Sequence, residues 1–360
     1  MKAIATRPGA RAAFLADLAD LLEPAMPLAP DQVLCRTLEV GVCGTDREIV
    51  ATAKPAVPRG EPFLVLGHEC LARIEQVGAD ARGVAPGDLV VPVVRRLLRG
   101  DVSRPDYAAE GDYVERGIFH EHGFASRWWL DRPEHLYKVN TALRDVAVLA
   151  EPLAVGEKAV NEALALQRGR LGDGIWTETP PRVLVTGMGP IAVLAVLACS
   201  VRGWPVTICG RDAAGSARVD VVEALGAQYV RFTSSGDVPP AAFDLVLECT
   251  GHEGVLLAAA RRLAPCGVMV WLGSSFEPRA ASWNLARLMG DAIVGNHVHV
   301  GSVNAAPRDF RDALEHLEAG VRRAPGALAG VITHRVSPDD APEHFTRRVE
   351  GAIKVVVEGW

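Results

Sequence analysis

Three short stretches of the chain carry residue types that can bind a metal ion. Cys43 and the consecutive pair His68-Glu69 lie in a region rich in short β-type runs, and Glu151 follows further along the chain. A thiolate, an imidazole and carboxylates around one open position are the ligands of a catalytic zinc site. A zinc ion there acts as a Lewis acid and makes an alcohol more acidic, so that its carbon can release hydride. The sequence therefore predicts one catalytic zinc.

Residues next to these ligands have two possible roles. The hydroxyl of Thr45 can relay a proton from a substrate alcohol, or Thr45 can be an ordinary turn residue. Asp46 can orient a metal-binding imidazole through a hydrogen bond, or it can cap a helix. By contrast, Cys35 and Cys70 lie in apolar runs, and we interpret both as core thiols.

A glycine-rich turn after a short apolar strand indicates a dinucleotide site. Gly187 and Gly189 follow the strand expected at 182–186, and Pro190 and Ile191 open an apolar helix. Such a turn directs the backbone N–H groups of the helix at a pyrophosphate. Ala192 takes the third position of the G-x-G-x-x-G/A pattern, where a small residue allows close packing.

The end of the next strand bears on the choice of cofactor. Folds selective for NAD place an acidic residue there, whereas this chain has Gly210 followed by Arg211. Gly210 carries no carboxylate to repel a 2′-phosphate, and Arg211 can pair with one. Two alternatives stay open, because Asp212 can pair with Arg211 instead, and Arg211 can be a solvated charge. We therefore expect NADP to be preferred, with NAD possible.

Length and charge exclude several classes of protein. The 360 residues predict about two domains, and a net charge of −6 without a long basic run makes nucleic acid and anionic membranes unexpected partners. Seven scattered cysteines suit a reducing compartment. The apolar stretch 188–201 is shorter than the roughly 20 residues of a spanning helix, and the first residues lack a signal-peptide pattern. We expect a cytoplasmic protein.

The pattern of elements changes near residue 152. Residues 1–150 resemble an antiparallel β-rich domain, with strands expected at 32–42, 63–77 and 88–94. From 152 to 303 strands alternate with helices, which is typical of βαβ units. There we expect strands at 182–186, 205–209, 243–248 and 267–272, and helices at 190–202, 219–225 and 255–263. A helix at 307–320 and strands at 330–336 and 353–357 follow, and this last segment returns to the first domain.

Several of these stretches together resemble the zinc-dependent medium-chain dehydrogenase/reductase superfamily, and within it the prokaryotic glucose dehydrogenases. The similarity is carried by residues 41–50 (GVCGTDREIV), 63–69 (FLVLGHE), 149–153 (LAEPL), 187–191 (GMGPI) and 300–304 (VGSVN). It implies an α/β protein, with a β-rich GroES-like catalytic domain at 1–153 and 304–360 and a doubly wound Rossmann domain at 154–303. It also implies a dimer or tetramer.

The resemblance assigns roles to individual residues. It implies zinc held by Cys43, His68 and Glu69, with Glu151 as a direct or water-mediated ligand. It implies that Glu115 and Asn304 hydrogen-bond sugar hydroxyls, that Glu151 lies at the substrate and that Asn304 also contacts the cofactor. Taken without the resemblance, Glu115 and Asn304 are polar residues in turn-rich segments.

The chain departs from the family pattern in the loop at 93–107. Family members often carry four cysteines there for a structural zinc, and this loop contains none, so we expect no structural zinc. We expect ion pairs to hold the lobe instead, made by Arg95, Arg96, Arg99 and Arg104 with Asp101 and Asp106. Ala72 replaces a glycine, and Val294 stands where some relatives carry a sugar-contacting histidine. These changes bear on the identity of the sugar.

We expect reversible hydride transfer between NAD(P) and a secondary alcohol or lactol, most naturally a sugar such as glucose, or a cyclitol. One alternative is a ketone reductase or alcohol dehydrogenase of a specialised biosynthetic pathway. A second alternative is a non-catalytic NADPH-binding protein, against which the complete set of candidate zinc ligands argues.

Overall fold

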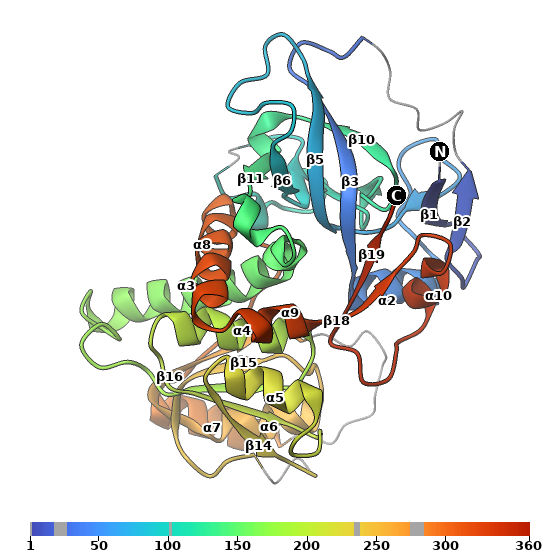
Figure 1. Ribbon diagram of the computed structural model, residues 1–360. Coiled ribbons are helices and arrows are strands. Elements are labelled where there is room, and N and C mark those ends of the chain that lie inside the picture. Colours follow the sequence, from blue (N-terminus) through green and yellow to red (C-terminus); the bar gives the residue numbers. More distant parts are fainter. Residues whose placement is uncertain (1, 18–26, 101–102, 234–237, 274–283) are drawn as a thin grey trace. The chain divides into compact units, whose positions relative to one another are not determined.

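The computed structural model describes residues 2–17, 27–100, 103–233, 238–273 and 284–360, and the chain divides into two compact units (Figure 1). The first unit comprises residues up to Glu151 together with Ala305–Glu318 and Ile332–Trp360. The second unit comprises Pro152–Asn304 and Ala319–Val331. In the parts of the chain that are described, no helix combines the length and the apolar character needed to cross a membrane.

The first unit is built on a largely antiparallel sheet with the order β11-β6-β5-β3-β19-β18, and β10 also pairs with β3. Figure 1 shows β5, β3 and β19 side by side. Two three-stranded sheets, β2-β1-β4 and β7-β8-β9, accompany it. The strands of the first unit are β1 (Lys2–Thr6), β2 (Phe14–Asp17), β3 (Val33–Val42), β4 (Leu64–Val65), β5 (Glu69–Val77), β6 (Leu89–Pro92), β7 (Arg95–Leu97), β8 (Tyr113–Arg116), β9 (His120–Glu121), β10 (Trp128–Asp131), β11 (Leu136–Lys138), β18 (Ile332–Val336) and β19 (Lys354–Glu358).

Short helices complete this unit. They are α2 (Gly44–Thr52), α10 (Ala341–Thr346), the start of α8 (Pro307–Arg323), and 3-10 turns at Pro105–Tyr107, Pro133–His135, Thr141–Leu143 and Ala147–Leu149. The C-terminal strand β19 pairs antiparallel with β3, with Val355 opposite Val42. The last residues of the chain thus complete the sheet that carries the residues around Cys43.

The run expected as one strand at 63–77 is two strands, because the chain breaks at Gly67. This glycine has a φ of +83°, and a side chain there would come within 2.7 Å of Val40. Only glycine adopts this backbone conformation without strain. The break ends β4 and places His68 directly before β5.

The second unit contains a six-stranded parallel sheet with the order β14-β13-β12-β15-β16-β17. This is the order of a doubly wound dinucleotide-binding fold, and right-handed crossovers put α4 and α5 on one face and α6 and α7 on the other. The strands are β12 (Val183–Thr186), β13 (Val206–Gly210), β14 (Ala227–Arg231), β15 (Phe243–Glu248), β16 (Leu263–Trp271) and β17 (Val298–Gly301). The helices are α3 (Ala150–Leu171), which begins in the first unit, α4 (Pro190–Val201), α5 (Ala217–Ala224), α6 (Glu253–Ala260), α7 (Leu285–Gly295) and α9 (Pro325–Val331).

The helix expected at 255–263 is wrong at its C-terminal end. Helix α6 ends at Ala260, and Leu263 already begins β16, where it pairs with Phe243. An apolar run such as this one fits a buried strand as well as a helix, so periodicity alone could not divide it. The long helix α3 and the edge strands β14 and β17 were not expected from the sequence.

The loop without cysteines is held by ion pairs. Arg95 pairs with Glu115 at 3.0 Å, Arg96 with Asp131 at 2.7 Å, Arg99 with Asp112 at 2.8 Å and Arg104 with Asp106 at 2.8 Å. The first two pairs are buried, whereas the side chain of Arg99 is 78% exposed. The expected partner Asp101 lies outside the described residues. The buried pairs are therefore the ones able to contribute to the stability of the lobe.

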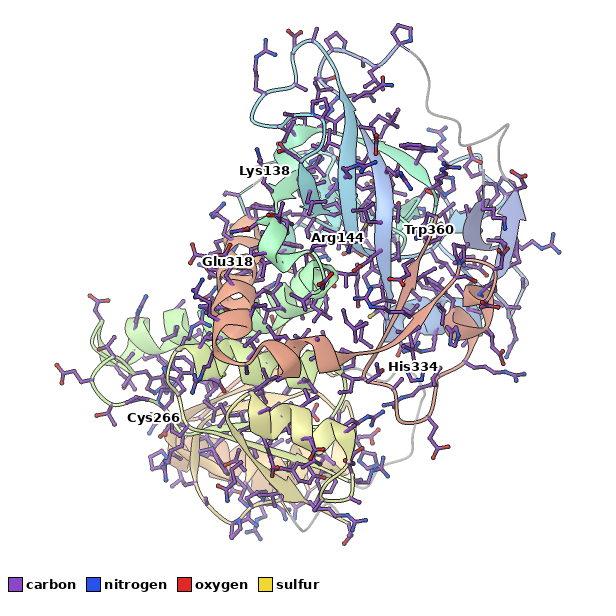
Figure 2. The ribbon with its side chains drawn as sticks, viewed as in Figure 1. Lys138, Arg144, Cys266, Glu318, His334 and Trp360 are labelled. Carbon is purple, nitrogen blue, oxygen red and sulfur yellow. The ribbon has the colours of Figure 1, made fainter. Side chains whose placement is uncertain are left out.

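A further buried charge ties the helical turns before α3 to the main sheet. Glu39 is 1% exposed and forms ion pairs with Arg144, which Figure 2 labels, and with Arg335 at 3.0 Å. Both arginines come from outside β3, so the pairs link three separate segments of the first unit.

Candidate active site

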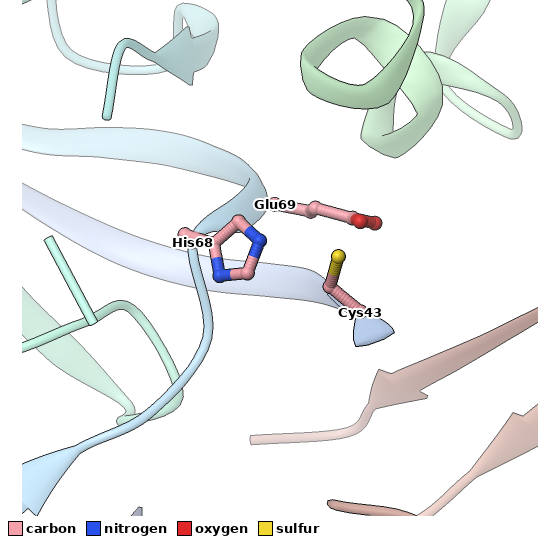
Figure 3. A group of neighbouring side chains, drawn as sticks. All are labelled: Cys43, His68 and Glu69. Atoms are coloured by element: carbon pink, nitrogen blue, oxygen red, sulfur yellow. The ribbon is translucent and has the colours of Figure 1, made fainter. Parts of the chain in front are cut away.

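Three candidate metal ligands converge in the first unit. The thiol of Cys43, a ring nitrogen of His68 and a carboxylate oxygen of Glu69 all lie within 4.8 Å of one another (Figure 3). His68 and Glu69 are buried, and Cys43 is half-buried. Sulfur, imidazole and carboxylate donors are those that zinc accepts. The donor set and its spacing therefore fit a zinc ion.

Asp46 organises this group from the start of helix α2. Cys43 is the N-cap of the helix, and its backbone N–H donates to the carboxylate of Asp46 at 2.8 Å. The N–H of Gly67 donates to the same carboxylate at 3.1 Å. Asp46 thus joins the segment before α2 to the break before β5, which brings Cys43 and His68 together. Asp46 has both of the roles that the sequence allows, because it caps the helix and also lies next to the imidazole of His68.

The ring of His68 lies against Asp46. Its Nδ1 is 3.5 Å from Oδ1 of Asp46, which leaves Nε2 as the nitrogen for a metal. Burial opposes the charged form of His68, but the carboxylate of Asp46 and the thiol of Cys43 raise its pKa well above the ordinary value.

The carboxylate of Glu69 is held by Lys354, a residue that no sequence motif indicates. Nζ of Lys354 lies 2.6 Å from both carboxylate oxygens, and each side chain is 1% exposed. Gly41, which pairs with Glu69 across β3 and β5, leaves room for this carboxylate, because a side chain there would come within 2.1 Å of it. The only feature of the sequence that could have indicated this buried charge is that Lys354 stands alone among the apolar residues 352–357.

Two other candidate residues lie beside the group. The hydroxyl of Thr45 is 3.8 Å from the sulfur of Cys43. Burial of Glu151, together with the nearby charge of Glu69, raises its pKa to about 7, although His68 and Lys354 oppose the shift. The carboxyl of Glu151 thus interacts electrostatically with the group, while the three ligand atoms that lie within 4.8 Å of one another come from the other residues.

The glycine turn of the second unit has the backbone features that the sequence predicts for it. Gly187 has a φ of +97°, as expected for the tight turn, and Gly189 is the N-cap of α4. A side chain at Gly189 would meet no atom within 4 Å, so the space in front of the helix is open. Pro190 and Ile191 form the first turn of α4, and Ala192 is buried beneath it.

Two arginines lie at the ends of neighbouring strands, Arg211 directly after β13 and Arg231 as the last residue of β14. Arg211 and Arg231 are both exposed, Gly210 is opposite Arg231 in the sheet, and Nε of Arg231 donates to the carbonyl of Arg211 at 3.4 Å. Asp212, one of the two alternatives for Arg211, pairs with Arg218 instead, at 3.3 Å. Among the described residues, Arg211 has no ion pair of its own. Arg231 was not singled out from the sequence.

The two candidate sugar contacts lie in separate units. Glu115 belongs to β8 and is paired with Arg95, with both side chains buried. Asn304 is half-buried at the end of the second unit, with a φ of +63°. The structure thus shows Glu115 as a carboxylate in an ion pair and Asn304 as a polar residue with a positive φ.

Two family models match the chain. One is described as glucose dehydrogenase C-terminus and matches residues 144–358, and the other as alcohol dehydrogenase GroES-like domain and matches residues 29–132. Glucose 1-dehydrogenase of Thermoproteus tenax is 39% identical to the chain over 360 residues, with 99% of each covered. Glucose 1-dehydrogenase 1 of Caldivirga maquilingensis is 38% identical over 328 residues, with 91% of each covered. The structure of Haloferax mediterranei glucose dehydrogenase in complex with NADP, Zn and gluconolactone has a TM-score of 0.86 at 28% identity and covers 100% of this chain and 99% of its own.

A GroES-like unit with a cysteine, histidine and glutamate group, joined to a dinucleotide-binding unit, defines a zinc-dependent medium-chain dehydrogenase/reductase. Proteins of this class are oxidoreductases that act on CH-OH groups. Within the class, the chain belongs to the glucose dehydrogenase family, since the family model spans more than half of it and relatives more than 30% identical match it almost end to end.

Proposed function

We propose that the protein oxidises the C1 hydroxyl of glucose, or of a closely related sugar, with NADP as the preferred acceptor. The observation that carries the proposal is the convergence of Cys43, His68 and Glu69 in a chain 39% identical to a glucose 1-dehydrogenase over its whole length. The reaction removes a hydride and a proton from the C1–OH group of the cyclic sugar, which leaves the lactone, and NADP becomes NADPH.

Cys43, His68 and Glu69 would hold the zinc ion, with Glu151 beside them. When bound, zinc supplies a Lewis acid that makes a nearby hydroxyl more acidic. We assign to Asp46, 3.5 Å from the ring of His68, the role of orienting that ring. To the Thr45 hydroxyl, which lies 3.8 Å from the sulfur of Cys43, we assign the relay of the proton that the substrate loses.

We assign recognition of the sugar to Glu115, Glu151 and Asn304. A carboxylate that accepts a hydrogen bond from a sugar hydroxyl contributes both affinity and stereochemical choice. The guanidinium of Arg95 lies 3.0 Å from the carboxylate of Glu115 and fixes its orientation. This carboxylate therefore does not have to be ordered when substrate binds.

Preference for NADP is assigned to the two arginines at the sheet edge. Asp212 is engaged by Arg218, and Gly210 brings no carboxylate, so no negative side chain at these positions opposes a 2′-phosphate. Arg211 and Arg231 supply the positive charge that would pair with it. We assign the pyrophosphate to the turn at Gly187 and Gly189 and the first residues of α4, and a further cofactor contact to Asn304.

The test is a substrate panel run on purified protein whose zinc content has been measured. Glucose, other aldoses, a cyclitol and a simple secondary alcohol are each supplied with NADP and with NAD, and NADPH or NADH absorbance is followed. We expect one zinc per chain and fastest turnover with a sugar and NADP. Turnover confined to the simple alcohol or to ketone reduction would overturn the sugar assignment. Cofactor binding with neither zinc nor turnover would instead identify a binding protein.

We also infer a homo-oligomer. The edge strand β17 pairs on one side only within the described residues, and four exposed apolar side chains lie on the neighbouring helix α7, namely Leu285, Met289, Ile293 and Val294. An unpaired strand edge beside apolar residues favours pairing with a second copy. Light scattering after size-exclusion chromatography should give a mass of at least two chains, and a monomeric mass at micromolar concentration would contradict the inference.

A further inference from the structure

Lys354 is a buried lysine at the start of β19 in the C-terminal segment. Its side chain is 1% exposed, and its Nζ lies 2.6 Å from both oxygens of Glu69 and 3.4 Å from the carbonyl oxygen of Val42. An ammonium group loses its hydration when it is buried, and that loss must be offset by partners in the protein. Here the main partner is the carboxylate of a candidate zinc ligand.

The position of the Glu69 carboxylate is constrained on two sides. Lys354 binds both of its oxygens, and the missing side chain of Gly41 leaves the space into which Oε2 fits. Strand pairing creates this arrangement, since Gly41 lies opposite both Glu69 and Val356 in the sheet. The carboxylate is therefore ordered before any metal binds.

Charge is the second element of the arrangement. With zinc bound, Cys43, Glu69 and Glu151 would bring three negative charges to a largely buried site, against two positive charges on the metal. Lys354 supplies the third positive charge. Asp46 adds one more carboxylate, but the backbone N–H groups of Cys43 and Gly67 and the ring of His68 stabilise it separately.

We propose that Lys354 is a positioning residue that holds the carboxylate of Glu69 in place, and that its positive charge, by competing with zinc for this carboxylate, lowers the affinity of the site for zinc. This inference rests on the proposed zinc site. A fixed cation repels a divalent ion and competes with it for the same carboxylate. In metal-free protein the same cation prevents repulsion between buried carboxylates. Removing it should thus destabilise the metal-free form and strengthen zinc binding, two effects of opposite sign.

The experiment uses Lys354→Met, which keeps much of the length of the side chain and removes its charge. Zinc affinity is measured by competition with a chromophoric chelator, and thermal unfolding is measured for metal-free and zinc-loaded protein. We expect zinc Kd to fall by about tenfold or more, within the usual range of coupling between sites. We also expect the melting temperature of the metal-free form to drop more than that of the loaded form, because zinc replaces the missing charge.

Three variants keep the test decisive. Lys354→Arg retains the cation and should keep zinc affinity near that of the wild type. The double variant Lys354→Met/Glu69→Gln removes both charges, so it should recover most of the metal-free stability lost in Lys354→Met. Lys158→Met removes a buried lysine of the second unit, whose Nζ donates to the carbonyl of Val303 at 2.7 Å, and should lower both melting temperatures equally.

The results separate the possible failures. An unchanged or weaker zinc affinity in Lys354→Met, with equal losses in both forms, would make Lys354 merely structural and overturn the inference. If Lys354→Met does not fold, the other two variants decide. The inference is overturned if the double variant also fails to fold, or if Lys354→Arg changes the zinc affinity. Wild-type protein that binds no zinc would refute the proposed function itself.

Discussion

Replacement of Asp131 by Asn tests whether buried ion pairs hold the lobe that lacks the metal-binding cysteines. The Asp131 carboxylate accepts bonds from Arg96 at 2.7 Å, from the ring of His135 at 2.9 Å and from the backbone N–H of Arg132 at 2.8 Å. Its side chain is 5% exposed and that of Arg96 is 7% exposed. Asn keeps the shape of the side chain and removes its charge.

Loss of one partner of a buried ion pair costs about 3–5 kcal/mol. Because the Asn oxygen can still accept one hydrogen bond, we expect the free energy of unfolding of the first unit to fall by about 3 kcal/mol at neutral pH. Asp112→Asn is the matched control, since it breaks the exposed pair with Arg99 in the same lobe, and it should cost about 0.5 kcal/mol or less.

The effect should also depend on pH. Burial works against the charge on Asp131, but Arg96 and the ring of His135 hold its pKa below the ordinary value. A carboxyl group whose folded pKa is lowered contributes stability above its unfolded pKa, about 3.9, and loses that contribution as the pH falls through the folded value. The difference between wild type and Asp131→Asn should therefore shrink as the pH falls below about 4.

Denaturant unfolding followed by tryptophan fluorescence measures this difference, with Trp129 packed close to the lobe. The measurement is repeated with a chelator, which should change neither the difference nor its pH dependence. A loss no larger than that of Asp112→Asn, or a difference that grows as the pH falls below about 4, would refute the assignment of lobe stability to the Arg96–Asp131 pair.

Three further predictions concern the active site. Gly210→Asp should shift the ratio of kcat/KM values from NADP toward NAD by about tenfold or more, because the new carboxylate repels the 2′-phosphate and a charged contact changes a binding constant by about that factor. Gly210→Ala is the control, because its side chain meets the same Met188 side chain but adds no charge. His68→Ala should remove zinc and turnover but retain NADPH binding in a fluorescence titration, and an active variant would exclude the zinc mechanism. Glu115→Gln, chosen because Ala would leave the buried Arg95 without its carboxylate partner, should raise KM for glucose about tenfold or more over any change for a simple alcohol; equal changes would remove Glu115 from sugar recognition.

Much of the second unit was predictable from local patterns. The strand Phe243–Glu248 lies where the sequence predicts it, and the helix expected at 190–202 is observed at Pro190–Val201. Both segments are bounded by turn-forming residues that act over a few positions. The errors occurred where such signals were missing, as at Leu263, or where one glycine divided an apolar run, as at Gly67.

The site divides in the same way. Donor types and short spacings in the sequence alone identified Cys43, His68 and Glu69 as a possible zinc group, because ligand chemistry depends on residue type. Lys354 follows Glu69 by 285 positions and meets it only because β19 pairs with β3. Local propensity and periodicity act over a few residues, whereas the partner of a buried charge is decided by which distant strands become neighbours. For that reason three candidate metal ligands could be predicted before folding was considered, and the cation that pairs with one of them could not.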